Sequence, residues 1–434
     1  MNSHAKEINQ YLRSLKPDWN VNLPHFNQFT IDKETQIFLV PPSNDALVYC
    51  ELVFVNGRIS EKKKMASRLT ANQLFEGCFG MESKELADFF DFYGVNYSMQ
   101  ADLDFSSLSF SCLHKHLAQV VEMMVRVLTE PSFSEENLEK GKKAIRSQLK
   151  HQLTEPDFVS YREFTARVYG PQSMYGYNSS VEFLEALTVE DLKTYHKENY
   201  TAKNLKVFYS GKMMPQGSKD YWTTVLKPFF SIEDTRGQFR YQMEVGIHSD
   251  HHYYIPSSTQ VSLKMGRRMF ERSHPDFYHS YLTNTILGDY FGSRLMKSIR
   301  EDYGLTYDIH STLDSQAWDG CFYISAEINA GSKIQTIEKI HSELNKLRTE
   351  PISSKELNTV KNYLLGHILR LMDGSIQTAI LIKILVLEYK GVSAFRQLLS
   401  AIETATPEDI LRISNQYLNP AEFFTITAGA GKSA

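Results

Sequence analysis

Arg300 and Tyr307 are the two residues whose types and spacing best suit the binding of a peptide group. Arg300 lies in a predicted short helix that ends at Gly304, and Tyr307 follows at the start of a predicted strand. A guanidinium and a phenol are hydrogen-bond donors, so both suit a peptide carbonyl or its developing oxyanion. The same residues also suit simple packing, with the arginine satisfying carbonyls at the helix end and the tyrosine half-buried on the strand. The local sequence leaves both interpretations open.

The helix that carries Arg300 has an amphipathic pattern. At about 100° per residue, its apolar stripe consists of Leu295, Ile299 and Tyr303. Arg300 falls at the edge of that stripe, beside Met296, where its side chain could reach a cleft. Arg294 and Lys297 are predicted to lie on a solvated face of the same helix.

Other signals of catalysis are weak. The chain has 14 histidines but no HExxH motif, no GxSxG elbow and no glycine-rich phosphate loop. Six histidines are candidates for metal ligands, and none of the six has a carboxylate or a cysteine at ligand spacing on the same predicted helix face. We therefore expect surface or turn positions for His114, His116, His251, His252, His274 and His279.

The composition limits the class of protein. With 434 residues, 42% hydrophobic and 23% charged, the chain is expected to form two or more globular domains. A net charge of −4 predicts no nucleic-acid partner. Four cysteines without a CxxC pair, and an N-terminus without an apolar signal segment, favour a cytoplasmic location with free thiols. The apolar run 379–387 contains Lys383 and predicts a core helix rather than a membrane span.

The periodicity of the chain predicts an alternation of strands and helices. We expect two strands around the Pro-Pro turn at 41–42, two more within 95–112, and one at 204–212. The predicted helices of this half cover residues 61–75, 83–93, 116–128 and 135–153.

Two segments recur along the chain. Residues 187–211 and 405–429 align without a gap at an offset of 218, and both carry a threonine N-cap followed by an aspartate, Thr188 with Asp191 and Thr406 with Asp409. The segments that begin at Thr129 and Thr349 repeat at nearly the same offset. Such self-similarity predicts a duplicated unit of about 200 residues. Each half is expected to be an α+β sandwich, a mostly antiparallel sheet covered by helices, related to the other by pseudo-symmetry. The expected organisation is an N-terminal extension 1–30, a first domain 31–212, a linker 213–257 and a second domain 258–434.

The duplicated half and the order of its signals resemble the pitrilysin/insulinase family of zinc metallopeptidases. The resemblance covers about residues 30–430, and its strongest part is LGDYFGSRLMKSIREDYGLTYDIHS, which is similar to the start of the family's second domain. Active members carry H-x-x-E-H, in which the histidines and a distant glutamate bind zinc and the internal glutamate acts as general base.

The resemblance implies that this chain has lost the zinc site. Counted back from the segment Leu74–Gly77, the motif positions are Arg68, Ala71 and Asn72, and the distant ligand position falls near Gln148. A cationic arginine opposes a divalent ion, the two amides are poor zinc ligands, and alanine cannot accept a proton. We expect no catalytic residue and no cofactor in this chain, with zinc in a partner subunit.

In active relatives the second domain supplies an arginine and a tyrosine, seven residues apart, that bind the substrate backbone. By this resemblance Arg300 and Tyr307 are substrate-binding residues. The first hypothesis is therefore a non-catalytic subunit of a heteromeric zinc endopeptidase that binds unfolded peptides and completes the active site of a zinc-bearing homologous partner. The sequence leaves open a homodimer instead of a heterodimer. The alternative is a catalytically dead scaffold or assembly subunit with no role in proteolysis.

Overall fold

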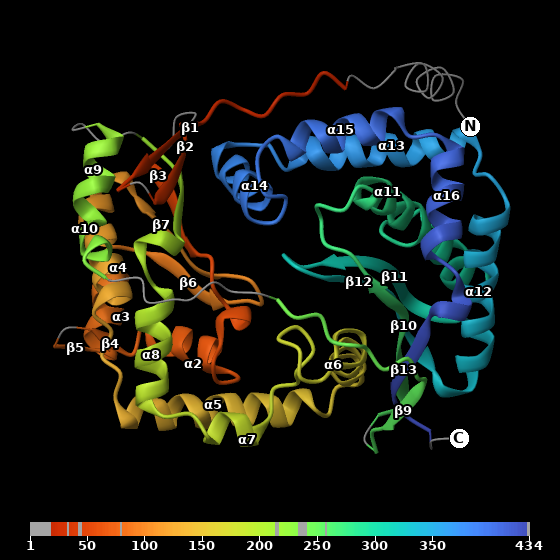
Figure 1. The fold of residues 1–434 in the computed structure, drawn as a ribbon, viewed down its shortest axis with the longest axis horizontal. Helices are drawn as coiled ribbons and strands as arrows, with labels where there is room; N and C mark the ends of the chain where they lie inside the picture. The colour runs from red at the N-terminus through yellow and green to blue at the C-terminus, as the bar shows by residue number, and fades with distance from the viewer. Residues whose placement is uncertain are drawn as a thin grey trace.

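A computed structural model describes residues 19–32, 34–41, 46–78, 80–212, 217–232, 241–256 and 258–431. Two sheets dominate it, one in each half (Figure 1). The first sheet has the order β1-β2-β8-β3-β7-β6 and the second β11-β12-β10-β13-β9. The strands of the first sheet are β1 (Asn27–Ile31), β2 (Thr35–Val40), β3 (Leu47–Phe54), β6 (Asn96–Ala101), β7 (Ser106–Leu113) and β8 (Leu205–Ser210). Those of the second are β9 (His251–Tyr254), β10 (Gln260–Met269), β11 (Thr306–Ser315), β12 (Gly320–Asn329) and β13 (Phe424–Gly429).

Apart from β1, which has no counterpart in the second sheet, the strands of the two sheets follow the same order, which confirms the predicted duplicated α+β fold. In the first sheet β2 pairs parallel with β8 and all other neighbours are antiparallel. In the second sheet β9 pairs parallel with β13 and all other neighbours are antiparallel. The capping boxes at Thr188 and Thr406 are both formed, each with the aspartate three residues later.

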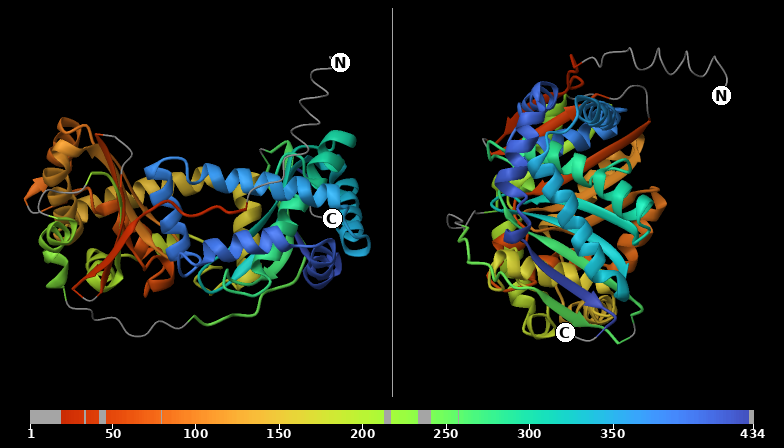
Figure 2. Two further views of the ribbon diagram at one scale, coloured as in Figure 1. Left: turned by 90° about the horizontal axis from the view of Figure 1, so that it is seen from above. Right: turned by 90° about the vertical axis from the view of Figure 1, so that its right-hand side faces the viewer.

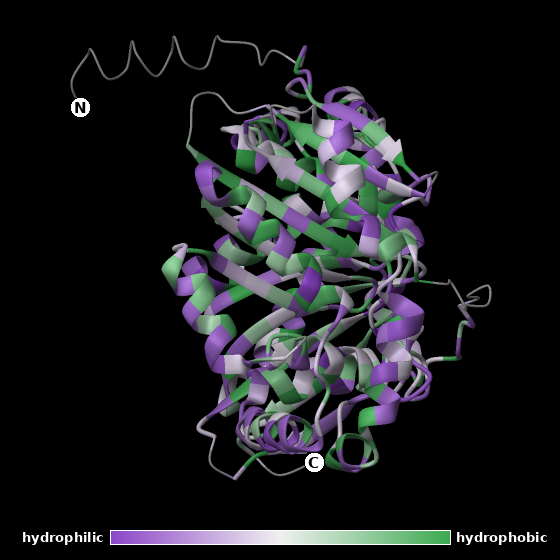
Figure 3. Cartoon of the chain, turned by 90° about the vertical axis from the view of Figure 1, so that its left-hand side faces the viewer, coloured by the Kyte–Doolittle hydropathy of each residue, from purple (hydrophilic) through white to green (hydrophobic). Residues whose placement is uncertain are grey.

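Helices cover the outer face of each sheet. In the first half these include α2 (Ala66–Gln73), α3 (Ser83–Phe92), α4 (Leu117–Thr129), α5 (Glu135–Gln152), α7 (Val181–Glu185), α8 (Val189–Asn199), α9 (Ser218–Val225) and α10 (Lys227–Phe230). In the second half they are α11 (Phe277–Leu287), α12 (Lys333–Thr349), α13 (Ser354–Arg370), α15 (Ala394–Thr404) and α16 (Pro407–Tyr417). Each half has its own large apolar core. Figure 3 shows the strands of the first sheet as long green stretches, with helices in front of them that mix green and purple. That mixture marks amphipathic helices on a buried sheet.

The halves exchange one helix each. Helix α6 (Pro156–Tyr169) belongs to the first half by sequence but packs on β10 and β13 of the second sheet. Helix α14 (Ser375–Leu387) belongs to the second half but packs on β2 and β8 of the first sheet. Figures 1 and 2 show the long helices α5 and α13 running from one half towards the other on opposite sides of the molecule. We refer to α6 and α14 as the exchanged helices.

Each exchanged helix buries an apolar face and supplies one partner of an ion pair with a buried residue of the opposite sheet. Ile382 and Ala379 of α14 pack against the side chains Phe38, Val40, Val53 and Phe208. Lys383 of α14 binds the buried Glu51 of β3, with 2.9 Å between Nζ and Oε1. On the other side Asp157 of α6 binds the buried Lys264 of β10, with 2.5 Å between Oδ1 and Nζ. The apolar run at 379–387 thus lies in a helix buried between the halves. No helix among the described residues is long and apolar enough to span a bilayer.

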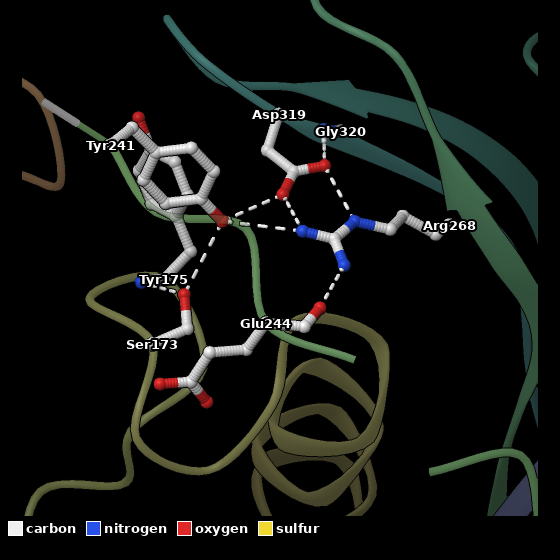
Figure 4. Close-up of polar contacts among 7 residues, drawn as sticks. All are labelled: Ser173, Tyr175, Tyr241, Glu244, Arg268, Asp319 and Gly320. Carbon is white, nitrogen blue, oxygen red and sulfur yellow. Dashed lines mark hydrogen bonds and ion pairs between the residues drawn. The ribbon is translucent and has the colours of Figure 1, made fainter. Parts of the chain in front are cut away.

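The segment between the halves is bonded to both of them (Figure 4). Arg268 of β10 forms a two-point ion pair with Asp319, whose side chain is almost fully buried, and donates to the carbonyl of Glu244. Tyr241 donates to Asp319 at 2.6 Å and lies 3.3 Å from Ser173 of the first half. Residues 241–247 are therefore fixed between the two halves.

Several element boundaries differ from the sequence-based expectation. The helix expected over 61–75 is shorter, Ala66–Gln73, and a 3-10 turn at Arg58–Ser60 precedes it. Strand β1 begins within the expected N-terminal extension 1–30, and β9, α9 and α10 lie within the expected linker 213–257. In α9 and α10, Trp222 and Phe229 are buried in the first core.

Candidate functional site

By the family resemblance, Arg68 stands at the first histidine of the zinc motif and Gln148 near the distant glutamate. The side chains of these two residues are in contact. Nη2 of Arg68 on α2 donates a 2.8 Å hydrogen bond to Oε1 of Gln148 on α5. The other two motif positions do not join this contact, because Ala71 is buried in the helix interface and Asn72 is exposed. A direct side-chain hydrogen bond thus links α2 and α5.

The donors at this place do not fit zinc. A guanidinium carries the wrong charge and has no acceptor, and a glutamine amide is a weak ligand. Among the described residues, no group of three or more His, Cys, Asp or Glu side chains could hold a metal ion. The chemistry of these residues supplies no metal-bound nucleophile and no general base.

A buried carboxylate fixes the start of α2. Glu61 accepts hydrogen bonds from the backbone nitrogens of Met65, at 3.0 Å, and Ser67, at 2.9 Å. Its oxygens also accept from the hydroxyls of Ser67 and Tyr177, both at 2.5 Å. These contacts hold Met65 in a left-handed conformation, φ 71°, which is costly for a residue with a side chain. Burial raises the pKa of Glu61, although its four hydrogen bonds and Arg58 act in the opposite direction.

Arg300 and Tyr307 also lie together. The guanidinium of Arg300 lies 4.8 Å from the ring centroid of Tyr307 and 5.5 Å from that of Phe291. Both rings are exposed, with 83% of Tyr307 and 67% of Phe291 accessible to solvent. The carbonyl of Arg300 accepts from the backbone nitrogen of Gly304, but neither the Arg300 guanidinium nor the Tyr307 hydroxyl forms a hydrogen bond or ion pair with another described residue, so these side-chain donors are available for a ligand.

The helix that carries Arg300 differs from the expectation. Met296–Asp302 form a π-helix rather than an α-helix. Leu295 and Ile299 are buried as predicted, but Tyr303 is 49% exposed, because the wider π-turn rotates it out of the apolar stripe. Arg294 was predicted to be solvated. Instead it forms a two-point ion pair with Glu356 of α13, at 2.7 and 2.9 Å.

A cavity of about 480 Å³ lies between the halves and contains Arg68. The first half contributes the start of α2 and the turn after β6, and the second half contributes the end of β11 and the end of α14. Its charged side chains are Arg58, Glu61, Arg68, Asp102, Asp104, Arg272, Asp314 and Glu388. Arg300 and Tyr307 are not among the residues that line it.

Strand β11 runs from the Arg300–Tyr307 pair to the cavity. Tyr307 is the second residue of the strand, and Ser315, its last residue, lines the cavity. A strand rises about 3.3 Å per residue, so these two residues lie about 26 Å apart along it. β11 is an outer strand, so one of its edges pairs with no other described strand, but the backbone nitrogen of Ser311 on it donates to the carbonyl of Gly288 at 3.2 Å.

Three residues that line the cavity, Arg58, Glu61 and Tyr177, could not be recognised as site residues from the sequence. Arg58 lies flat on the ring of Tyr177, with 3.5 Å between its guanidinium carbon and the ring centroid, and donates to that residue's carbonyl. Tyr177 in turn donates to Glu61, which is 116 residues away along the chain. Contacts at such separations leave no local pattern.

Two family descriptions match the chain. Residues 38–173 match "Insulinase (Peptidase family M16)" and residues 186–364 match "Peptidase M16 inactive domain". The chain is 22% identical over 310 residues to the "Uncharacterized zinc protease YmxG" of Bacillus subtilis, covering 71% of this chain and 75% of that protein. It is 20% identical over 332 residues to the "Non-peptidase homolog YmxG" of Helicobacter pylori, covering 71% and 72%.

Solved structures share the fold. A peptidase M16 inactive domain from Pseudomonas fluorescens superposes with a TM-score of 0.84 at 21% identity, covering 94% of this chain and 98% of that one. A chain of complex III2 from Candida albicans gives a TM-score of 0.75 at 14% identity, covering 93% and 95%. The matched residues, the shared fold and the lost metal ligands lead to one conclusion. The chain belongs to the insulinase family of peptidases, family M16, as a homologue of the inactive type.

Proposed function

We propose that this protein is a non-catalytic subunit of a heteromeric zinc endopeptidase. It binds the backbone of an unfolded peptide through Arg300 and Tyr307 and completes the active site of a zinc-bearing homologous subunit. The zinc is held by that partner, because the residues of this chain do not suit a metal.

One observation carries the proposal. The guanidinium of Arg300 lies near two exposed aromatic rings, Phe291 and Tyr307, at the start of the outer strand β11, with its donors uncommitted to described residues. A side chain that served only to satisfy the helix end would turn towards the carbonyls there. An exposed strand edge adds a peptide as a further strand through backbone hydrogen bonds, with loose sequence preference. The guanidinium and the phenol would then donate to carbonyls of that peptide.

The test is turnover by the assembled enzyme. The tagged chain is purified from its native source with whatever homologue accompanies it, the metal content is measured, and cleavage of an unfolded peptide is followed. Replacing both residues, Arg300→Ala with Tyr307→Phe, should lower kcat/KM at least tenfold, since charge-assisted hydrogen bonds contribute roughly 1.5–3 kcal/mol each. Lys297→Ala, an exposed cation on the same π-helix, is the matched control and should leave turnover unchanged.

A catalytically dead scaffold is the second candidate. The Arg68–Gln148 hydrogen bond favours it, because this contact replaces a metal link by a purely structural one. The fold shared with a chain of complex III2 is compatible with such a role. If the double variant assembles normally and turnover is unchanged, the scaffold is the better account.

A further inference from the structure

Phe291 is an exposed aromatic residue that lies beside the guanidinium of Arg300. Its side chain belongs to none of the apolar cores formed by the described residues. The guanidinium carbon of Arg300 lies 5.5 Å from the centroid of the Phe291 ring and 4.8 Å from that of Tyr307. Both distances are within the range at which an aromatic ring attracts a cation. The arginine therefore has one aromatic neighbour in the turn before its helix and another in the strand after it.

Two contacts anchor the turn that carries Phe291, between α11 and the π-helix. The ring centroid of Tyr290 lies 4.9 Å from that of Tyr363 on α13. Directly after the turn, Arg294 forms its two-point ion pair with Glu356 of the same helix. The residues on either side of Phe291 are thus fixed to α13, so the ring has a defined place although its side chain is exposed.

The third exposed ring near the π-helix has a cation of its own. Nζ of Lys339 on α12 lies 3.8 Å from the ring centroid of Tyr303. Phe291 and Tyr307, by contrast, share Arg300. Because the Arg300 guanidinium forms no hydrogen bond or ion pair with a described residue, these two rings are the contacts that favour its orientation.

We propose that Phe291 is a positioning residue, which holds the Arg300 guanidinium in the orientation that donates to a peptide carbonyl. The inference rests on the proposed peptide-binding function and adds a third residue to it. An aromatic ring attracts a guanidinium without accepting its in-plane hydrogen bonds, so the N–H groups stay free for a carbonyl. A mobile arginine side chain loses much of its rotamer freedom when it binds a ligand, whereas a side chain already held by two rings loses less.

The test is a double-mutant cycle on the assembled enzyme, with Phe291→Leu, Arg300→Ala and both changes together. Phe291→Leu removes the ring but keeps an apolar side chain, and should lower kcat/KM about two- to fivefold, which corresponds to a cation–π contact at an exposed site. In the Arg300→Ala background the same change should have no further effect, because no guanidinium is left to position. The melting temperature of Phe291→Leu should equal that of the native protein, since the side chain is exposed.

Further variants assign the effect to the ring. Phe291→Trp keeps an aromatic face and should give a kcat/KM within about twofold of the native value, whereas a loss as large as that of Phe291→Leu would contradict the proposal. Phe92→Leu removes a ring of α3 that is 81% exposed, and should leave turnover unchanged. If Phe291→Leu assembles poorly, Phe291→Met makes the same comparison with another apolar side chain that lacks a ring.

The outcomes separate this inference from the proposed function. If Arg300→Ala lowers kcat/KM and Phe291→Leu does not, the positioning role is wrong and peptide binding through Arg300 stands. If the two losses add in the double variant, Phe291 acts independently of Arg300, which also overturns the positioning role. If neither change alters turnover, the proposed function and this inference both fail.

Discussion

At the scale of single residues, His196 shows how burial fixes a protonation state. Its ring lies inside the first half, with Nε2 donating to the carbonyl of Leu128 at 2.7 Å and the ring stacked on Tyr200 at 5.1 Å. Burial lowers the pKa of His196 to about 4, and the carbonyl contact acts weakly in the other direction. The folded protein therefore keeps this imidazole neutral.

This histidine predicts a loss of stability in acid. The unfolded chain takes up a proton at His196 near pH 6.5, whereas the folded chain does so only near pH 4. The contribution of the neutral His196 to the free energy of unfolding is thus fully present above about pH 6.5. It is lost as the pH falls towards 4, by at most about 1.4 kcal/mol per pH unit. His196→Gln should make the pH dependence of the free energy of unfolding shallower in that range, as measured by urea denaturation at several pH values. The exposed His151→Gln is the control, and a similar slope in His196→Gln and the native chain would contradict the prediction.

The sequence anticipates only some of these residue contacts. Arg300 and Tyr307 are seven residues apart across a helix end, so local geometry alone brings them near each other. Arg68 and Gln148 are 80 residues apart, and only the family resemblance suggests that they meet. Nothing in the sequence indicates the π-turn that exposes Tyr303, because a π-helix and an α-helix share the same apolar residue types. Arg58, Glu61 and Tyr177 meet only through the tertiary fold.

At the scale of elements, each exchanged helix supplies one ion-pair partner to the opposite sheet, and the two partners have opposite charges. Glu51 on β3 is paired across the sheet with Phe208, and Lys264 on β10 is paired with Ile426. These two partners differ by 218 positions, the offset of the repeated segments, so Glu51 and Lys264 occupy equivalent places. The helix facing the glutamate supplies Lys383, and the helix facing the lysine supplies Asp157.

The ion pair between α14 and the first sheet should be strongly coupled. Glu51→Lys or Lys383→Glu alone would leave like charges together in a buried place, at a cost of roughly 3–5 kcal/mol in the free energy of unfolding. The double swap restores the pair with its charges reversed and should recover at least about half of the summed loss. Chemical denaturation of the four proteins measures the coupling. Strictly additive losses would show that the pair does not determine which helix docks.

Helices and strands were largely predictable, but the exchange was not. Periodicity located β2, β3, β6, β7 and β8 and the long helices α4 and α5, because each has one apolar face or an alternating pattern. Helix α14 is apolar nearly all round, which signals burial on several sides without saying by what. Only the length and direction of α13 decide that α14 reaches the opposite sheet, and that information is three-dimensional.

At the scale of the whole molecule, several separate contacts hold the two halves together. The exchanged helices, the segment 241–247 and the cavity wall all contain residues of both halves or contact both. The peptide bond between the halves is therefore only one of several connections.

Cutting the chain between the halves should not separate them. A protease site inserted after Ile232 divides the protein into fragments that remain joined by two exchanged helices, each with a buried apolar face and an ion pair to the opposite sheet. After cleavage, native size-exclusion chromatography should show one species of the original size, and a denaturing gel should show two fragments. The same cleavage in Lys383→Glu is the informative comparison, since it weakens one of the two helix contacts. Separate elution of the native fragments would show that the covalent link is essential.

The exchange of helices also constrains how such a chain could arise. A single half made alone leaves one sheet face, with Phe38, Val40, Val53 and Phe208, without its cover. Two identical copies of one half could cover each other in a twofold dimer by lending one helix apiece. In such a dimer both copies would carry the same residue at the strand position. The opposite charges at Glu51 and Lys264 therefore require two halves of different sequence.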